Sequence, residues 1–236
     1  MNPPSIGVTQ VFASPIVHSA LVDCVALNRR LRELFLQWEQ EAKQRTSLPT
    51  QVVKVGVYES SFDLFHRSDP EIQQLTQFCL QTLGHVITQL NGYSTEEMAE
   101  LRIFHHSWYH LTRAGGYTAQ HNHPMASWSG VYCVDPGDTS PEHPNSGALR
   151  FLEARSTASM YLDPGNADMR SPFGFGDIAF NFQPGQLLLF PSYLLHEVAP
   201  YYGQRERITV AFNAWVRYAD EPALEPGVRL RKRKTA

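Results

Sequence analysis

The sequence predicts a mainly β fold of the sandwich or jelly-roll type, with N-terminal helices packed on one side of it. After about residue 100, short β-type runs alternate with turn-rich stretches, and no helical pattern separates them. Before that point, two segments carry apolar residues at helical spacing. Because the helices come first and the strands afterwards, we expect the helices to cover one side of the β structure.

The two helical segments have recognisable patterns and ends. Over residues 21–43, leucine, valine and aromatic residues recur near helical spacing with charged residues between them. A strand and a loop are expected over residues 51–67. The second helix begins near residues 68–71, which place a proline in its first turn, and ends at Gly92. These two helices and the strand form the predicted lead-in to the β region.

The β region is predicted from five apolar runs separated by turns rich in Gly, Pro, Asn and Asp. The runs are LRIFHHSWYHL (101–111), SWSGVYCV (127–134), GALRFLEA (147–154), GQLLLFPS (185–192) and RITVAFNAWV (207–216). We therefore expect a helical and extended lead-in over residues 1–99, a β core over 100–218, and a basic tail over 219–236. The lead-in packs on the core, which gives one structural domain overall.

Composition excludes several classes of protein. The 236 residues carry a formal net charge of −3, which argues against a broadly basic nucleic-acid-binding surface. No apolar run is long enough to span a membrane, and no secretory signal pattern opens the chain. Three widely spaced cysteines fit a reducing compartment better than a disulfide framework, so we expect a cytoplasmic protein. Composition leaves the oligomeric state open.

Ten histidines and 11% aromatic residues point instead to a histidine-based site in a β-rich fold. The strongest local feature is His121-Asn122-His123. Side chains two apart on a strand point to the same face, so these imidazoles can converge on one metal ion. A third histidine, His196, follows the buried run GQLLLFPS, and a jelly roll can bring it back to the first two.

Arg207 is the second chemical feature, because it opens the apolar strand RITVAFN. An arginine at the start of an apolar strand is costly to bury without a negative partner. The strand itself has no Asp or Glu. The partner is therefore either a bound anionic ligand or a nearby carboxylate, with Glu197 and Glu206 as the candidates.

The order His-x-His, His, Arg and Asn resembles that of the iron(II)- and 2-oxoglutarate-dependent oxygenases, and in particular a little-characterised bacterial and phage-associated branch of them. The stretches that carry the resemblance are SSFDLF (60–65), SWYHLTRAGGYTAQHNHP (107–124), SGVYCV (129–134), GALRF (147–151), GQLLLFPSYLLHEV (185–198) and RITVAFN (207–213). They extend from about residue 55 to residue 216. The resemblance implies a double-stranded β-helix, a cupin-like distorted jelly roll that holds the metal between its two sheets.

The resemblance also assigns the metal ligands. His121 takes the first place of the family's ligand triad and His196 the last, while His123 stands where the family usually has a carboxylate. His123 either binds the metal, or lies behind it, or leaves the place to an acidic residue from elsewhere; we favour binding. Three neutral histidines leave the site one charge more positive than a site with a carboxylate. This favours an anionic co-substrate such as 2-oxoglutarate, and it keeps zinc as a competitor.

The remaining site residues follow from the same resemblance. Arg207 and Thr209 are expected to hold the far carboxylate of 2-oxoglutarate, with Tyr117 and Asn213 as further co-substrate contacts. Trp108 and Trp128 are expected to border the substrate.

The predicted function is a non-haem oxygenase that uses Fe(II), 2-oxoglutarate and O₂, and that hydroxylates an unactivated C–H of a small molecule, an amino acid or a peptidyl side chain. No nucleic acid or membrane partner is expected. One alternative is a cupin-like three-histidine dioxygenase or zinc enzyme that does not use 2-oxoglutarate. Another is a non-catalytic jelly-roll binding module. Neither the prime substrate nor the outcome of the reaction follows from the sequence.

Overall fold

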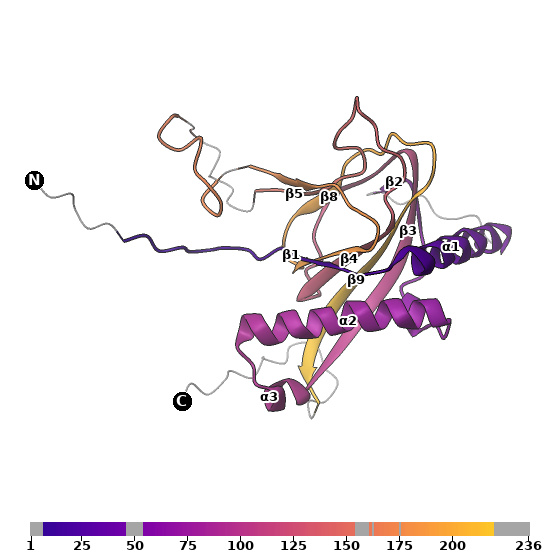
Figure 1. Ribbon diagram of the computed structural model, residues 1–236, viewed down its shortest axis with the longest axis horizontal. Coiled ribbons are helices and arrows are strands. Elements are labelled where there is room, and N and C mark those ends of the chain that lie inside the picture. The colour runs from indigo at the N-terminus through magenta and orange to yellow at the C-terminus, as the bar shows by residue number, and fades with distance from the viewer. Residues whose placement is uncertain (1–6, 46–53, 154–160, 162, 175, 220–236) are drawn as a thin grey trace, which may run out of the picture.

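A computed structural model describes residues 7–45, 54–153, 161, 163–174 and 176–219 of the chain (Figure 1). Within them, nine strands form one antiparallel sheet in the order β1-β7-β4-β9-β3-β8-β5-β6, with β2 paired to β3. The strands are β1 (Val17–Ala20), β2 (Lys54–Glu59), β3 (Leu101–His121), β4 (Trp128–Asp135), β5 (Leu149–Phe151), β6 (Ile178–Phe180), β7 (Gln186–Pro191), β8 (His196–Val198) and β9 (Arg207–Tyr218). The helices are α1 (Val25–Arg45), η1 (Leu64–His66, a 3-10 turn), α2 (Pro70–Asn91) and α3 (Thr95–Ala99).

The long strand β3 joins the two halves of this curled sheet. It pairs with β9 from Leu101 to Thr112, and then with β8 at Thr118 and His121. The strand changes partners near Gly116, where an added Cβ would lie 2.7 Å from the carbonyl oxygen of Gly56. Glycine is therefore required for this close approach of β2 to β3. The curled sheet confirms the predicted mainly β, jelly-roll class of fold.

Helices α1 and α2 cover one face of the sheet (Figure 1). Leu31 and Phe35 of α1 and Leu75 and Leu83 of α2 are fully buried in the larger hydrophobic core. Phe35 stacks on Tyr109 of β3 with ring centroids 4.2 Å apart, which attaches α1 to the sheet. The N-terminal helices thus pack on one side of the β structure, as predicted.

The first helix begins four residues later than the sequence pattern predicts. Leu21 donates its backbone N–H to the carbonyl of Gly185, so it continues the extended path of β1. The second helix begins at Pro70 and ends at Gly92, whose φ of +66° gives the left-handed conformation that glycine tolerates. Strand pairing therefore overrides helical periodicity at the start of α1.

The lead-in is also joined to the core through the sheet, because β1 pairs with β7 and β2 pairs with β3. A second hydrophobic cluster fills the space between the sheet's two halves; its members are Cys133, Leu149, Phe151, Phe182, Leu188, Phe190 and Leu194. No helix among the described residues is long and apolar enough to cross a membrane. Apart from residue 219, the predicted basic tail lies outside the described residues.

Candidate metal centre and its cavity

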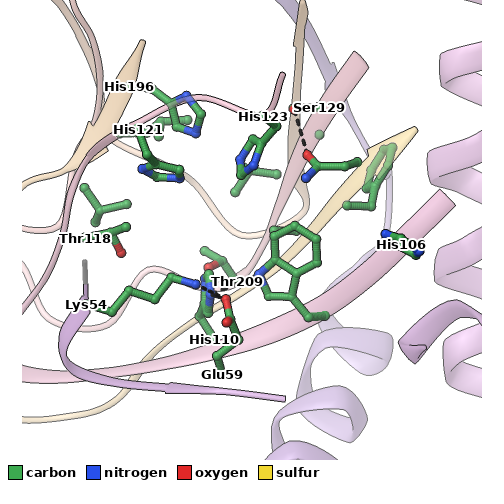
Figure 2. Close-up of a pocket in the computed structure, with 18 of the residues that line it drawn as sticks. Lys54, Glu59, His106, His110, Thr118, His121, His123, Ser129, His196 and Thr209 are labelled. Atoms are coloured by element: carbon green, nitrogen blue, oxygen red, sulfur yellow. Dashed lines mark hydrogen bonds and ion pairs between the residues drawn. The ribbon is translucent and has the colours of Figure 1, made fainter. Parts of the chain in front are cut away.

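A cavity of about 380 Å³ lies inside the curl of the sheet (Figure 2). Its floor follows from the register of β3 and β9, in which His106 pairs with Asn213, Trp108 with Ala211 and His110 with Thr209. The other lining residues include polar, aliphatic and aromatic side chains. Phe62, Phe182, Phe190 and Phe212 are the phenylalanines among the lining residues.

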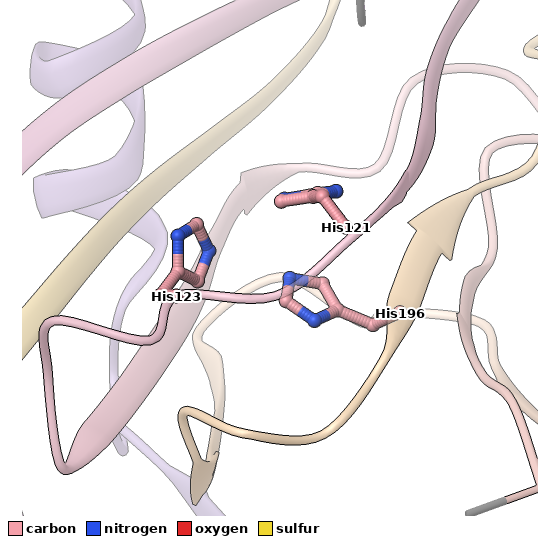
Figure 3. A group of neighbouring side chains, drawn as sticks. All are labelled: His121, His123 and His196. Carbon is pink, nitrogen blue, oxygen red and sulfur yellow. The ribbon is translucent and has the colours of Figure 1, made fainter.

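Three histidines converge at one wall of this cavity (Figure 3). His121 and His196 face each other across the paired strands β3 and β8, with ring centroids 4.3 Å apart. His123 follows just beyond the end of β3, where its backbone N–H donates to the carbonyl of Ser192. One nitrogen from each ring lies within 4.8 Å of the other two. The two-residue spacing thus brings His121 and His123 together, although only His121 lies in a strand.

Backbone hydrogen bonds fix the orientation of two of the rings. Nδ1 of His121 is 2.8 Å from the carbonyl oxygen of Ala119, and Nδ1 of His196 is 2.9 Å from that of Leu194. Each Nδ1 therefore carries the proton and donates it, which leaves Nε2 with a free lone pair. This arrangement, a backbone carbonyl behind each imidazole, is typical of histidines that bind a metal.

The three rings are also held in the neutral form that binds metals. Burial lowers the pKa of all three histidines, and their mutual repulsion adds to the effect for His123 and His196. The pKa values of His123 and His196 fall to about 3 and about 4, respectively. Near neutral pH the site therefore offers lone pairs without first having to release protons.

Among the described residues, no carboxylate joins the histidine group. Such a donor set of three imidazoles, open to a cavity, suits a catalytic divalent metal, either iron or zinc. Of the three possibilities for the middle ligand place, the geometry favours His123 itself, because its ring stands 5.0 Å and 5.2 Å from the rings of the other two.

Arg207 lines the same cavity and is 4% exposed. Within the described residues no carboxylate lies within 4 Å of its guanidinium, and burial lowers its pKa. Both candidate partners are paired elsewhere: Glu197 with Arg150 and Glu206 with Arg32, each at 2.8 Å. Gly147 makes room for the side chain, since an added Cβ there would lie 2.8 Å from Arg207 Cδ.

The other predicted site residues divide into two groups. Thr209, Asn213 and Trp108 line the cavity. Tyr117 and Trp128 do not: Tyr117 is 37% exposed, and Trp128 packs against the helix-side core. The reason is strand alternation, because their neighbours Thr118 and Ser129 are the residues that face the cavity.

A linked group of polar residues in the opposite wall escaped the sequence analysis (Figure 2). Lys54 forms an ion pair with Glu59, and His110 Nε2 lies 2.7 Å from Glu59 Oε2 and 3.0 Å from the Trp108 indole nitrogen. Because a carboxylate only accepts, the N–H of His110 Nε2 donates to Glu59. Burial would raise the pKa of Glu59, but hydrogen bonds and charges from His110 and Lys54 lower it to about 2. Five residues apart, Lys54 and Glu59 belong to opposite faces of a regular strand. The irregularity of β2 at Gly56 brings them to one face.

The segment that contains this site matches a known protein family. Residues 106–213 match the family model described as "Putative 2OG-Fe(II) oxygenase". The match confirms the resemblance drawn from the sequence motifs, and its range includes the three histidines, Arg207 and Asn213. No curated protein sequence matches the chain.

Solved structures of the same fold include a prolyl-4-hydroxylase from Pseudomonas putida, with 18% identity, a TM-score of 0.56, and coverage of 86% of this chain and 92% of that one. A prolyl hydroxylase from Trichoplax adhaerens, in complex with a hypoxia inducible factor peptide fragment, has 14% identity, a TM-score of 0.53, and coverage of 85% and 83%. The epimerase SnoN, in complex with Fe³⁺, alpha ketoglutarate and nogalamycin RO, has 12% identity, a TM-score of 0.55, and coverage of 92% and 88%. At these identities the likeness establishes the fold, a jelly roll.

Proposed function

We propose that the protein is a 2OG-Fe(II) oxygenase in which His121, His123 and His196 bind iron(II) and Arg207 binds 2-oxoglutarate. The match of residues 106–213 to the family model supports this proposal. In this proposal the protein is an oxygenase that hydroxylates an unactivated C–H bond of a small molecule, an amino acid or a peptidyl side chain. Its cofactors are Fe(II), 2-oxoglutarate and O₂.

One observation carries this proposal: a buried arginine, to which no carboxylate of the described residues comes within 4 Å, lines the cavity that holds the three histidines. A buried, uncompensated cation is strongly unfavourable. The far carboxylate of 2-oxoglutarate would compensate it, and a guanidinium can bind that carboxylate through two parallel hydrogen bonds. The buried hydroxyl of Thr209, on the same strand, is placed to add a further hydrogen bond.

The charges in the cavity support an anionic co-substrate. Lys54 and Glu59 neutralise each other, and the three histidines are neutral, so Arg207 and a divalent metal leave an excess of positive charge. A dianion that binds both the metal and Arg207 would reduce this excess. Iron(II), when bound, supplies the oxygen activation that side chains cannot perform. The chain's own contribution is to orient the ligands and to exclude water with the four phenylalanines of the cavity.

The donor set itself supports a second candidate. Three neutral histidines with no carboxylate and an open coordination position also fit a catalytic zinc site or a three-histidine dioxygenase that does not use 2-oxoglutarate. In that case Arg207 would bind an anionic group of the substrate.

The metal site can be tested by anaerobic equilibrium dialysis against Fe²⁺. We expect one iron per wild-type chain, and a loss of affinity of more than about a hundredfold in His121→Ala and in His196→Ala, since each removes a ligand. His85→Ala, in a histidine on α2 outside the cavity, serves as the control and should bind iron as the wild type does. Full iron binding in a His121→Ala/His196→Ala double variant would refute the assignment.

The co-substrate is tested by calorimetric titration of 2-oxoglutarate into the manganese-loaded protein without oxygen. Binding at one site per chain is expected, followed by succinate release when iron and O₂ replace manganese and a substrate panel is added. If the metal binds but 2-oxoglutarate does not, the second candidate replaces the first.

A further inference from the structure

Strands β3 and β9 continue beyond the cavity as a two-stranded ribbon, one face of which is covered by helices (Figure 1). Ile103 and Val216 of the ribbon pack on that side, against the core that contains α2. The opposite face carries Arg102, Phe104 and His106 from β3 and Asn213, Trp215 and Arg217 from β9, and we call these six residues the ribbon face. Arg102, Phe104 and His106 are all exposed.

The ribbon face leads without interruption into the cavity. Arg217 lies over the Phe104 ring at 5.2 Å, Phe104 stacks beside Trp215 at 6.3 Å, and Trp215 meets His106 edge-on at 5.0 Å. His106 and Asn213 in turn line the cavity next to Trp108. The Trp108 ring is 6.2 Å from that of His123. A continuous strip therefore joins the end of the ribbon to the histidine group.

The strip is too long to serve a small molecule alone. Arg102 and Trp108 lie six positions apart on one strand, which corresponds to about 20 Å. An extended polypeptide of roughly six residues has the same length. The strip is also an open surface and not an enclosed pocket, which suits a segment of a larger partner.

The positive charge of the ribbon face indicates which kind of partner it would bind. Within the part of the chain that the structure describes, neither Arg102 nor Arg217 has an ion-pair partner, whereas Arg30, Arg67, Arg150 and Arg205 each pair with a carboxylate. The ribbon face itself carries no acidic residue. The two arginines therefore match a partner that brings carboxylates.

We propose that the ribbon face docks an extended acidic peptide segment, whose adjoining side chain then enters the cavity. For the fate of that side chain this inference rests on the function proposed above; for binding it does not. The basic end of the chain's own tail is a poor occupant, because it carries five basic residues between Arg229 and Lys234. A single-stranded nucleic acid fits less well, since base stacking needs free aromatic faces, and the Phe104 ring already contacts both Trp215 and Arg217.

Fluorescence anisotropy on the metal-free, full-length protein tests the docking directly. The probe is a fluorescein-labelled random copolymer of glutamate and tyrosine, with a lysine–tyrosine copolymer and oligothymidylate as comparison probes. We expect the acidic copolymer to bind and the other two not to bind. Arg102→Glu should weaken binding by about tenfold or more, and Phe104→Ala by about fivefold, because they remove a charge contact and an aromatic contact.

The matched control is Arg29→Glu, which makes the same charge change at an exposed arginine of α1, far from the ribbon in sequence. It should change the affinity by less than about twofold, and Arg102→Gln should lie between Arg102→Glu and the wild type. The proposal is overturned if the acidic copolymer does not bind, if Arg29→Glu and Arg102→Glu weaken it equally, or if oligothymidylate binds more tightly. Because the assay contains no metal or 2-oxoglutarate, its failure leaves the proposed function untouched, and a failed 2-oxoglutarate titration leaves the ribbon face untouched.

Discussion

Two arginines lie close together in the sheet and differ in what surrounds them. Arg113 follows Thr112, which pairs across the ladder with Arg207. On the helix side, Arg113 donates two hydrogen bonds to Glu39, at 2.8 Å and 2.7 Å, and Glu39 is 2% exposed. On the cavity side, Arg207 is more deeply buried than Arg113, and no described carboxylate lies within 4 Å of it.

This contrast indicates that Arg113 stabilises the fold, whereas Arg207 is available to bind a ligand. The Arg113–Glu39 pair is complete within the fold, so its energy contributes to folding. Arg207 has no such carboxylate among the described residues, so the fold retains the cost of burying its charge. A ligand carboxylate that binds Arg207 would supply the favourable ion-pair energy that Glu39 supplies to Arg113. Lys54 supports the same distinction, because it also lines the cavity but is paired with Glu59.

The largest expected effect concerns ligand binding. Arg207→Ala should weaken 2-oxoglutarate binding by about 2–5 kcal/mol, which is roughly 30- to 3,000-fold, because it removes one partner of a partly buried, two-pronged ion pair. Calorimetric titration into the manganese-loaded, oxygen-free protein measures this loss. Arg207→Lys should recover only part of it, since an ammonium cannot reproduce the fork. Arg113→Ala is the control; if it weakened 2-oxoglutarate binding as much as Arg207→Ala does, the distinction would be lost.

The next effect concerns the free energy of unfolding, which replacement by methionine should change differently at Arg113 and at Arg207. Arg113→Met leaves Glu39 buried without its bidentate partner and should lower the free energy of unfolding by about 2–4 kcal/mol, at the lower end because Arg113 is 41% exposed. Arg207→Met removes an uncompensated charge and should leave stability unchanged or raise it by about 1 kcal/mol. Urea denaturation of the ligand-free proteins compares the two. A large loss of stability in Arg207→Met would mean that Arg207 already has a partner in the fold.

The smallest effect concerns the glycine that accommodates Arg207. Gly147 has a φ of +66°, and an added Cβ would lie 2.8 Å from Arg207 Cδ. Gly147→Ala should therefore cost about 1–2 kcal/mol of stability and also weaken 2-oxoglutarate binding, while metal binding remains.

Gly92 provides a matched control for this substitution, because it has the same φ of +66° but no atom within 4 Å of the added Cβ. Gly92→Ala should show the backbone cost in a thermal melt and no change in a 2-oxoglutarate titration. Equal effects of the two substitutions on 2-oxoglutarate binding would show that Gly147 does not position Arg207.

Periodicity and motif spacing, which are local properties, determined much of this protein. Helical spacing predicted α1 and α2, and the alternation of apolar runs with turns predicted the mainly β region. The His-x-His pair, the distal His196 and the buried arginine were identifiable because their residue types are costly or rare in such contexts. These signals were sufficient to identify the family that matches residues 106–213.

Tertiary structure alone decided which side chains share the cavity. A one-residue difference moves a side chain to the other face of a strand, so Thr118 and Ser129 line the cavity where Tyr117 and Trp128 were predicted to act. The irregularity at Gly56 brings Lys54 and Glu59 to one face, against simple alternation. Glu197 pairs with Arg150 and Glu206 with Arg32, so neither is available to Arg207, and both pairs join residues far apart in the chain. Local sequence cannot specify such contacts, because they arise only when the sheet curls and brings distant strands together.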